Sequence, residues 1–220
     1  MALTIYSELI DEVQSWLSRS ATDLSDAQVG TFVSMAEDRI HRELRIRELE
    51  TSADLTINAQ SIALPTTVPF LAARRVYISG SPNSRLGYLT PASFWLRFMS
   101  SDTDKPKGYT IEGDNIIFGP SPDSTYTGKL LYWGRLGAFS SDSDTNSLLT
   151  RHRGLYLYGS LLEASLFLGD DARVLTWAAA FDDAVEKVQK MDRRDRIPAG
   201  SPEMTVDGVN ADADVNVVTG

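Results

Sequence analysis

The sequence predicts an α+β fold, with a helical bundle core, an inserted antiparallel β-rich lobe and an extended C-terminal tail. Apolar residues recur at helical spacing in residues 5–49 and again in residues 148–196. Between these stretches, short apolar segments alternate with turns rich in proline, glycine and asparagine, as is typical of strands. We therefore expect the helical core in residues 1–50 and 147–197, the lobe in residues 51–146 and the tail in residues 198–220.

Two helices are expected before the lobe, in residues 5–17 and from Ser25 to about Leu49. Apolar residues fall on one face of each helix, and Ser25 with Gln28 three residues later has the spacing of a capping box. The second helix also carries opposite charges four residues apart, at Asp38 and Arg42, Arg39 and Glu43, and Glu43 and Arg47. Because such pairs stabilise a helix surface, we expect this helix to face solvent or another subunit.

The lobe is expected to hold a mostly antiparallel sheet, because the connections between its strands look too short for helical crossovers. Gly113 and Asp114 are typical of a two-residue turn in a β-hairpin. Thr90 followed by Pro91 predicts the start of a short aromatic helix, since the first helical position does not need a backbone N–H. The expected strands lie around residues 55–57, 62–64, 76–78, 109–112, 115–118 and 126–136.

Residues 154–169 predict a helix that is apolar on nearly every side, with Glu163 as its only charge. The helix expected in residues 171–194 has a single apolar stripe and covers only one side of it. The remaining cover must come from the rest of the chain or from neighbouring subunits. Because an unpaired buried charge is costly, we expect Glu163 to be a structural residue, paired with an arginine such as Arg151 or Arg153 or hydrogen-bonded in the core.

Composition excludes several classes of protein. The chain has 220 residues, of which 42% are hydrophobic, so it can bury a substantial core. Its 30 acidic and 21 basic residues give a net charge of −9, which disfavours tight, sequence-independent binding to nucleic acid. The absence of cysteine excludes disulfides and thiolate metal sites. Residues 154–168 are too few to span a bilayer and no secretory signal is visible, so we expect a soluble protein without membrane contact.

We expect no catalytic residues, no cofactor and no metal site. The sequence lacks the common hydrolase, nucleotide-binding and zinc motifs, and its only histidines are His41 and His152. The adjacent Asp170 and Asp171 suit a helix N-terminus better than a metal site, which needs more oxygen ligands. A carboxylate-based hydrolase remains an alternative, because a catalytic pair of carboxylates needs no fixed spacing in the sequence.

Arginines are the main candidates for an interface. Because protein interfaces favour arginine and aromatic residues over lysine, we expect a subunit contact at Arg42, Arg45, Arg47, Arg151 and Arg153. An aromatic set supports this expectation, although any member of it belongs equally well in the lobe core: Tyr88, Trp95, Phe98, Tyr132 and Trp133. A nucleic-acid-binding regulator is a further alternative, which the acidic balance disfavours.

The tail carries acidic residues but no basic or aromatic ones, too little apolar surface to fold alone. Its valines have the β-forming character needed to add to another chain, so we expect Val206, Val209, Val215 and Val217 at an intermolecular contact.

Several segments resemble the head-to-tail adaptor, or connector, proteins of tailed bacteriophages. The resemblance begins in the long helix at residues 36–50 and continues in residues 148–171 and 191–194. It includes the hairpin at residues 109–118 and the Gly-Pro-Ser-Pro turn that follows, and by pattern it covers about residues 5–202.

This resemblance implies a structural protein of the virion rather than an enzyme. The family implies a helical core with a β insertion, repeated around a homo-oligomeric ring, a dodecamer, that docks beneath the portal protein and carries the tail or nozzle protein. Genomic DNA is expected to pass through the bore without specific binding, which agrees with the negative net charge. The arginines and tail valines are then expected to contact the portal or a neighbouring subunit. The expected location is the head–tail interface, after assembly in the cytoplasm of the bacterial host.

Overall fold

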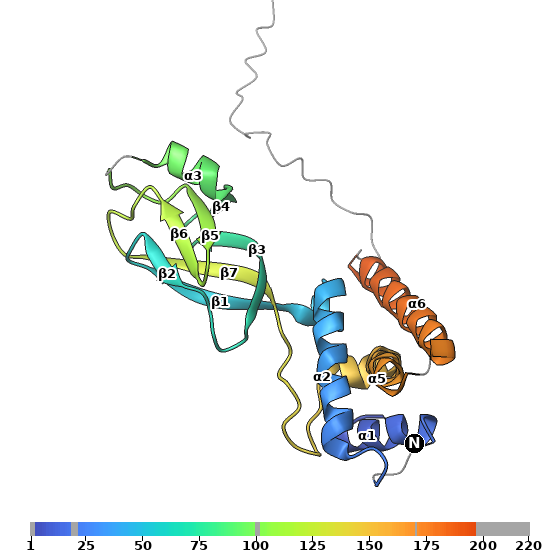
Figure 1. Cartoon of the computed structure of the whole chain (residues 1–220). Coiled ribbons are helices and arrows are strands. Elements are labelled where there is room, and N and C mark those ends of the chain that lie inside the picture. The colour runs from blue at the N-terminus through green and yellow to red at the C-terminus, as the bar shows by residue number, and fades with distance from the viewer. Residues whose placement is uncertain (1–2, 19–21, 100–101, 170, 197–220) are drawn as a thin grey trace, which may run out of the picture.

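The computed structural model describes residues 3–18, 22–99, 102–169 and 171–196, and it consists of a group of helices beside a β-barrel (Figure 1). The helical group contains α1 (Tyr6–Trp16), α2 (Asp26–Glu43), α4 (Ser147–Arg151), α5 (Arg153–Leu168) and α6 (Asp171–Asp195). The barrel contains β1 (Glu50–Ile57), β2 (Ser61–Ala63), β3 (Phe70–Ile78), β4 (Ser84–Tyr88), β5 (Gly108–Glu112), β6 (Asn115–Gly119) and β7 (Tyr126–Gly134), together with the short helix α3 (Pro91–Arg97).

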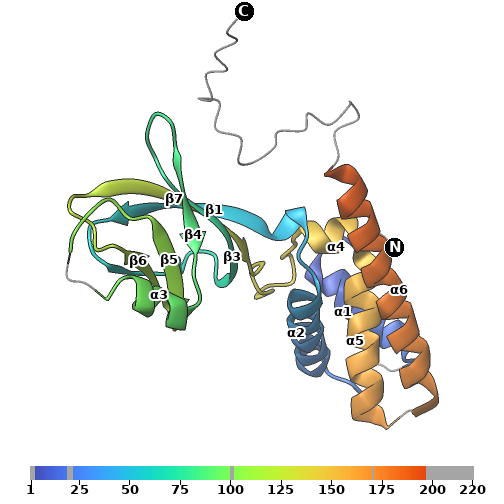
Figure 2. The same cartoon turned by 90° about the horizontal axis from the view of Figure 1, so that it is seen from above.

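Helix α5 lies at the centre of the helical group, between α2 and α6 (Figure 2). Leu155, Leu161 and Ala164 on this helix are at most 1% exposed. The cover that its apolar sequence requires therefore comes largely from the same chain, from α1, α2, α4 and α6. The last turn of α5 is the exception, because Leu166 and Phe167 are 53% and 62% exposed.

The second helix begins as the sequence predicts but ends earlier. The Ser25 hydroxyl accepts a hydrogen bond from the Gln28 N–H, in the expected capping box. The helix then ends at Glu43 rather than near Leu49, and the chain passes through a 3₁₀ turn at Arg47–Leu49 into β1. Two interactions favour this early end. The Arg45 guanidinium donates to the carbonyls of His41 and Leu44, and the Leu44 side chain is fully buried.

The strands form one seven-stranded sheet with the order β1-β7-β3-β4-β5-β6-β2. The two end strands, β1 and β2, are joined through residues 58–60, so the sheet curls back on itself into a near-closed barrel. The barrel has a hydrophobic core of its own, in which Ile57, Val76, Ile116, Phe118 and Leu130 are fully buried. The predicted hairpin is present, and Gly113 in its turn has φ +55°, a conformation that favours glycine.

The expected fold class is wrong in its architecture. The chain is α+β, but it is not a helical bundle core with an inserted antiparallel lobe, because the strands close into a near-complete barrel around their own core. The sheet is mostly antiparallel, as expected, but β4 and β5 are parallel. Helix α3 lies in the connection between these two strands and forms a helical crossover. The expectation that the connections are too short for such a crossover is therefore wrong here. The expected extended tail, residues 198–220, lies outside the described residues.

The close approach of α2, α5 and α6 yields a first prediction. A Cβ added at Gly159 of α5 lies 2.9 Å from the Ala36 Cβ and 3.3 Å from the Phe181 ring. We expect Gly159→Ala to lower the free energy of unfolding by about 1–2 kcal/mol, because overpacking outweighs the gain in helix propensity.

Urea denaturation measures this change. The control is Gly87→Ala, where an added Cβ meets nothing within 4 Å, and it should leave the stability nearly unchanged. An equal stability of Gly159→Ala and the original protein would contradict the packing described here.

Candidate assembly interface

A buried polar cluster lies where residues 135–146, which return from the barrel, pass beside α2. The Leu136 N–H donates to His41 Nε2 at 3.2 Å. The Tyr156 hydroxyl donates to Glu37 Oε1 at 3.2 Å and accepts from the Asn146 side-chain amide at 2.7 Å. The cluster therefore ties the returning segment to α2 and α5. In the sequence His41 lies among charged residues of the long helix, a pattern that gives no sign of this burial.

Between about pH 4.5 and 6.5, Glu37 and His41 in the cluster have protonation states opposite to those of the same side chains in water. Burial, together with the positive charge of Arg135, lowers the pKa of His41 to about 4, so the imidazole is neutral and its Nε2 can accept. Burial raises the pKa of Glu37 to about 7, although the Tyr156 hydroxyl opposes this shift. Glu37 and His41 are only 5% and 4% exposed, so these two groups face the protein interior rather than a substrate.

Two ion pairs join α2 to other segments. Arg39 Nη2 lies 2.6 Å from Glu163 Oε1 on α5, and Glu163 is 7% exposed. The partner of Glu163 is thus Arg39, rather than Arg151 or Arg153. Asp38 pairs with Arg135 from the returning segment. The charges that we expected to pair along α2 therefore include two that reach across to other elements.

The five candidate interface arginines are all exposed and gather where α2 and α6 end and α5 begins. The Arg47 backbone N–H donates to Asp192 Oδ1 on α6 at 2.8 Å, and Arg151 Nη1 lies 3.4 Å from Glu48 Oε1. A groove follows the junction of the two helix ends, lined by Glu43, Arg45, Ile46, Gln189, Asp192 and Arg193. The structure thus brings these arginines to one end of the helical group.

The aromatic set divides between surface and core. Tyr88 and Trp95 are 55% and 41% exposed, and Phe98 packs against Phe94 of α3. Tyr132 is buried in the barrel, where its hydroxyl donates to the Val68 carbonyl at 3.0 Å. Trp133 is partly buried, with the Arg74 guanidinium over its ring.

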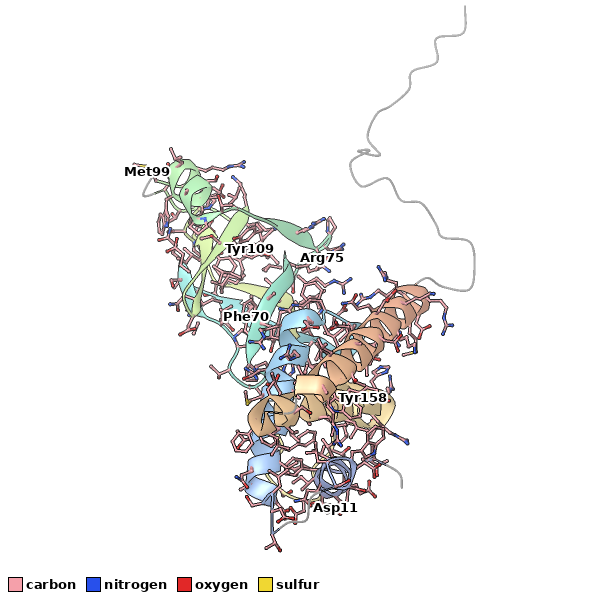
Figure 3. All side chains as sticks on the ribbon, turned by 45° about the vertical axis from the view of Figure 1, so that its right-hand side comes forward. Asp11, Phe70, Arg75, Met99, Tyr109 and Tyr158 are labelled. Carbon is pink, nitrogen blue, oxygen red and sulfur yellow. The ribbon has the colours of Figure 1, made fainter. Side chains whose placement is uncertain are left out.

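The end of α5 and the start of α6 expose a group of apolar side chains, which we call the apolar tip. Phe167 within it packs on Phe32 of α2, with ring centroids 5.4 Å apart. Leu175 is 77% exposed. The tip consists of Met35, Leu166, Phe167, Leu168 and Leu175. A second exposed group lies on and beside α3 and includes Leu96 and Met99. Figure 3 shows Met99 at the end of the barrel remote from the helices.

Residues 3–18, 22–99, 102–169 and 171–196 offer neither a metal site nor a membrane-spanning helix. In these residues no cluster of three or more histidine, aspartate or glutamate side chains is arranged to hold a metal ion. None of the helices in the same residues is both long and apolar enough to cross a membrane. Asp170 and the candidate tail residues Val206, Val209, Val215 and Val217 lie outside the described residues.

Glu37 and His41 in the buried cluster should make the stability of the protein depend on pH in opposite directions, so that the two effects cancel where they overlap. Between about pH 4.5 and 7 the folded protein retains a proton on Glu37 that the unfolded chain loses, so Glu37 alone lowers stability as pH rises. Between about pH 6.5 and 4 the unfolded chain gains a proton on His41 that the folded protein excludes, so His41 alone lowers stability as pH falls. Folding therefore moves one proton from imidazole to carboxyl in the overlapping range.

Removing either Glu37 or His41 should reveal the pH dependence of stability that the other group causes. We expect the stability of Glu37→Gln to rise by about 2–3 kcal/mol from pH 4 to 6.5, and that of His41→Gln to fall by a similar amount from pH 4.5 to 7. Urea denaturation across this pH range measures both slopes. Parallel pH profiles for the two variants would show that the cluster is not protonated in this way.

Comparison with known proteins identifies the family. The model of the SU10 adaptor protein family matches residues 4–204, which include both the helical group and the barrel. No curated protein matches the chain. The match confirms the resemblance inferred from the sequence, and the chain belongs to the SU10 adaptor proteins, a family of bacteriophage head–tail adaptors.

Proposed function

We propose that this adaptor forms a closed ring, a dodecamer, that joins the portal to the tail and lets DNA pass through its bore. Membership of the family makes the protein a virion component of the head–tail interface, associated with portal and tail proteins. The ring, its size and the passage of DNA are our proposal, as is assembly in the host cytoplasm.

The apolar tip is the main observation that supports the proposed ring. Contiguous exposed apolar groups on soluble proteins mark sites of contact with other proteins. The tip combines one residue of α2 with the end of α5 and the start of α6, and Leu166, Phe167 and Leu175 are each more than half exposed. A ring with cyclic symmetry uses two different surfaces of each copy, so the tip of one copy would pack on another face of the next.

Charge supports the passage of DNA. The net charge is −9, so the basic groups of the protein are outnumbered by its acidic groups and leave no net positive charge for the phosphates. Binding to a DNA backbone depends on lysine and arginine that release condensed cations. A bore built from such subunits would let DNA move through it without specific binding.

The candidate arginines and the tail are proposed as contact residues. Arg42, Arg45, Arg47, Arg151 and Arg153 share one exposed end of the helical group, which suits a contact with the portal or a neighbouring subunit. The tail valines would add to that contact, since extended valine-rich segments pair readily with the edges of other sheets. We assign the protein no catalytic activity, because the family has a structural role.

Substitution in the apolar tip tests the ring. We expect Leu175→Ser to fold normally, because the side chain is 77% exposed, but to reduce ring formation with the portal several-fold through loss of apolar contact. Electron microscopy and light scattering of the adaptor mixed with its portal protein measure ring formation.

The matched control is Ala179→Ser, which makes an exposed position of the same helix more polar without removing a large apolar side chain. Rings of unchanged yield in Leu175→Ser would remove the apolar tip from the interface. If the original protein also formed no rings with the portal, the proposed function itself would be wrong.

A further inference from the structure

Six basic side chains form an exposed surface at the end of the helical group where α2 and α6 meet. Five of them line the groove described above or lie within a few residues of it along the chain. The sixth, Arg153, follows His152, which lies beside Arg47 and Asp192 in a neighbouring pocket. All six are exposed in a protein whose net charge is −9. We call this surface the basic end, and it consists of Arg42, Arg45, Arg47, Arg153, Lys190 and Arg193.

Most acidic groups near the basic end pair with other cations, whereas Glu43 in the groove has no ion pair among the described residues and offsets one of the six positive charges. Glu48 pairs with Arg151, and Asp195 pairs with Arg194. Asp192 and Glu50 both pair with Arg196, each at 2.6 Å. The ion pairs found in the described part of the chain include none of the six side chains of the basic end. The surface thus carries uncompensated positive charge.

The described chain ends beside this surface. Arg196 is held by Asp192, which also lines the groove, so the last described residue lies at the edge of the basic end. The residues that follow, 197–220, contain Glu203, Asp207, Asp212 and Asp214 and no basic residue. The first acidic residue is within about 25 Å of Arg196 along an extended chain, so the segment can reach the whole surface.

We propose that the acidic segment 203–214 binds the basic end of its own chain in the isolated adaptor. A short tether gives the segment an effective concentration of about millimolar at this surface. Exposed ion pairs are individually weak, but several formed together hold the segment in place at low salt. Screening weakens them as salt rises.

This docking has a consequence for assembly that rests on the proposed function. The arginines assigned to the portal or neighbouring subunit are covered by the segment in the isolated protein. Contact with a partner and docking of the segment therefore exclude one another, and the isolated protein is kept from associating through this surface.

Paramagnetic labelling tests the proposal directly, and the absence of cysteine makes the label specific. A nitroxide is attached to Thr205→Cys in the ¹⁵N-labelled full chain, without portal. At about 0.05 M salt, we expect amide signals around Arg45 and Arg193 to lose more than half their intensity, and at about 0.5 M salt to recover it.

Two charge variants and one control show whether the loss of signal is caused by contact between the acidic segment and the basic end. Neutralising the segment with Glu203→Gln, Asp207→Asn, Asp212→Asn and Asp214→Asn should abolish the broadening. Neutralising the surface with Arg153→Gln, Lys190→Gln and Arg193→Gln should abolish most of it, and this variant keeps Arg45 because its guanidinium ends α2. The control neutralises three exposed cations of the barrel, Arg97, Lys107 and Lys129, and should leave the broadening intact.

Full signal intensity around Arg45 and Arg193 at low salt would overturn the proposal. A mixture of nitroxide-labelled ¹⁴N chain with unlabelled ¹⁵N chain reports contact between copies. Broadening of equal strength in that mixture would show that the segment binds a second copy, which also overturns docking within one chain. These measurements need no ring, so their failure leaves the proposed function standing.

Discussion

Helix α5 must lose its apolar surface to the protein interior on every side, and the helical group is arranged around that requirement. Two long helices lie against it, α1 and α4 close the remaining gaps, and Gly159 lets α2 and α6 approach closely. Burial on this scale contributes more than any polar contact in the group. The described residues leave the last turn of α5 uncovered, and the surface exposed there is the one we assign to a neighbouring copy.

Polar groups then decide how the barrel is attached to the helices. The chain crosses between the two parts twice, after α2 and again in residues 135–146. Both crossings are fixed to α2: Arg45 closes the end of the helix at the first, and His41 and Asp38 hold the second. Burial favours the neutral forms of His41 and Glu37, and it makes the attachment specific at a cost in solvation.

The sequence predicted local structure better than it predicted architecture. The capping box at Ser25, the proline at the start of α3 and the Gly113 turn depend on neighbouring residues, and all three are confirmed. Strand β4 was missed because it is five residues long with a single buried side chain, Leu86, and so shows little periodicity. The barrel was missed because closure depends on β1 pairing with β7 and on the parallel pair that α3 makes possible, neither of which leaves a local signal.

The candidate site shows the same division. The five arginines were expected at a subunit contact, and they share one exposed end of the helical group, but the partner of Glu163 is Arg39 of α2, far away in sequence. His41 was judged from its charged neighbours along α2, whereas its burial depends on the returning segment. Long-range contacts of this kind are visible only once the fold is known.

The double crossing between helices and barrel has a mechanical consequence. A force that pulls the barrel away from the helices is carried by two stretches of backbone in parallel, so each bears only part of the tension. Both stretches are anchored on α2, which packs closely on α5, so the load on the barrel passes into the packed helices. A linkage of this design suits an adaptor that is held between two other proteins of the virion.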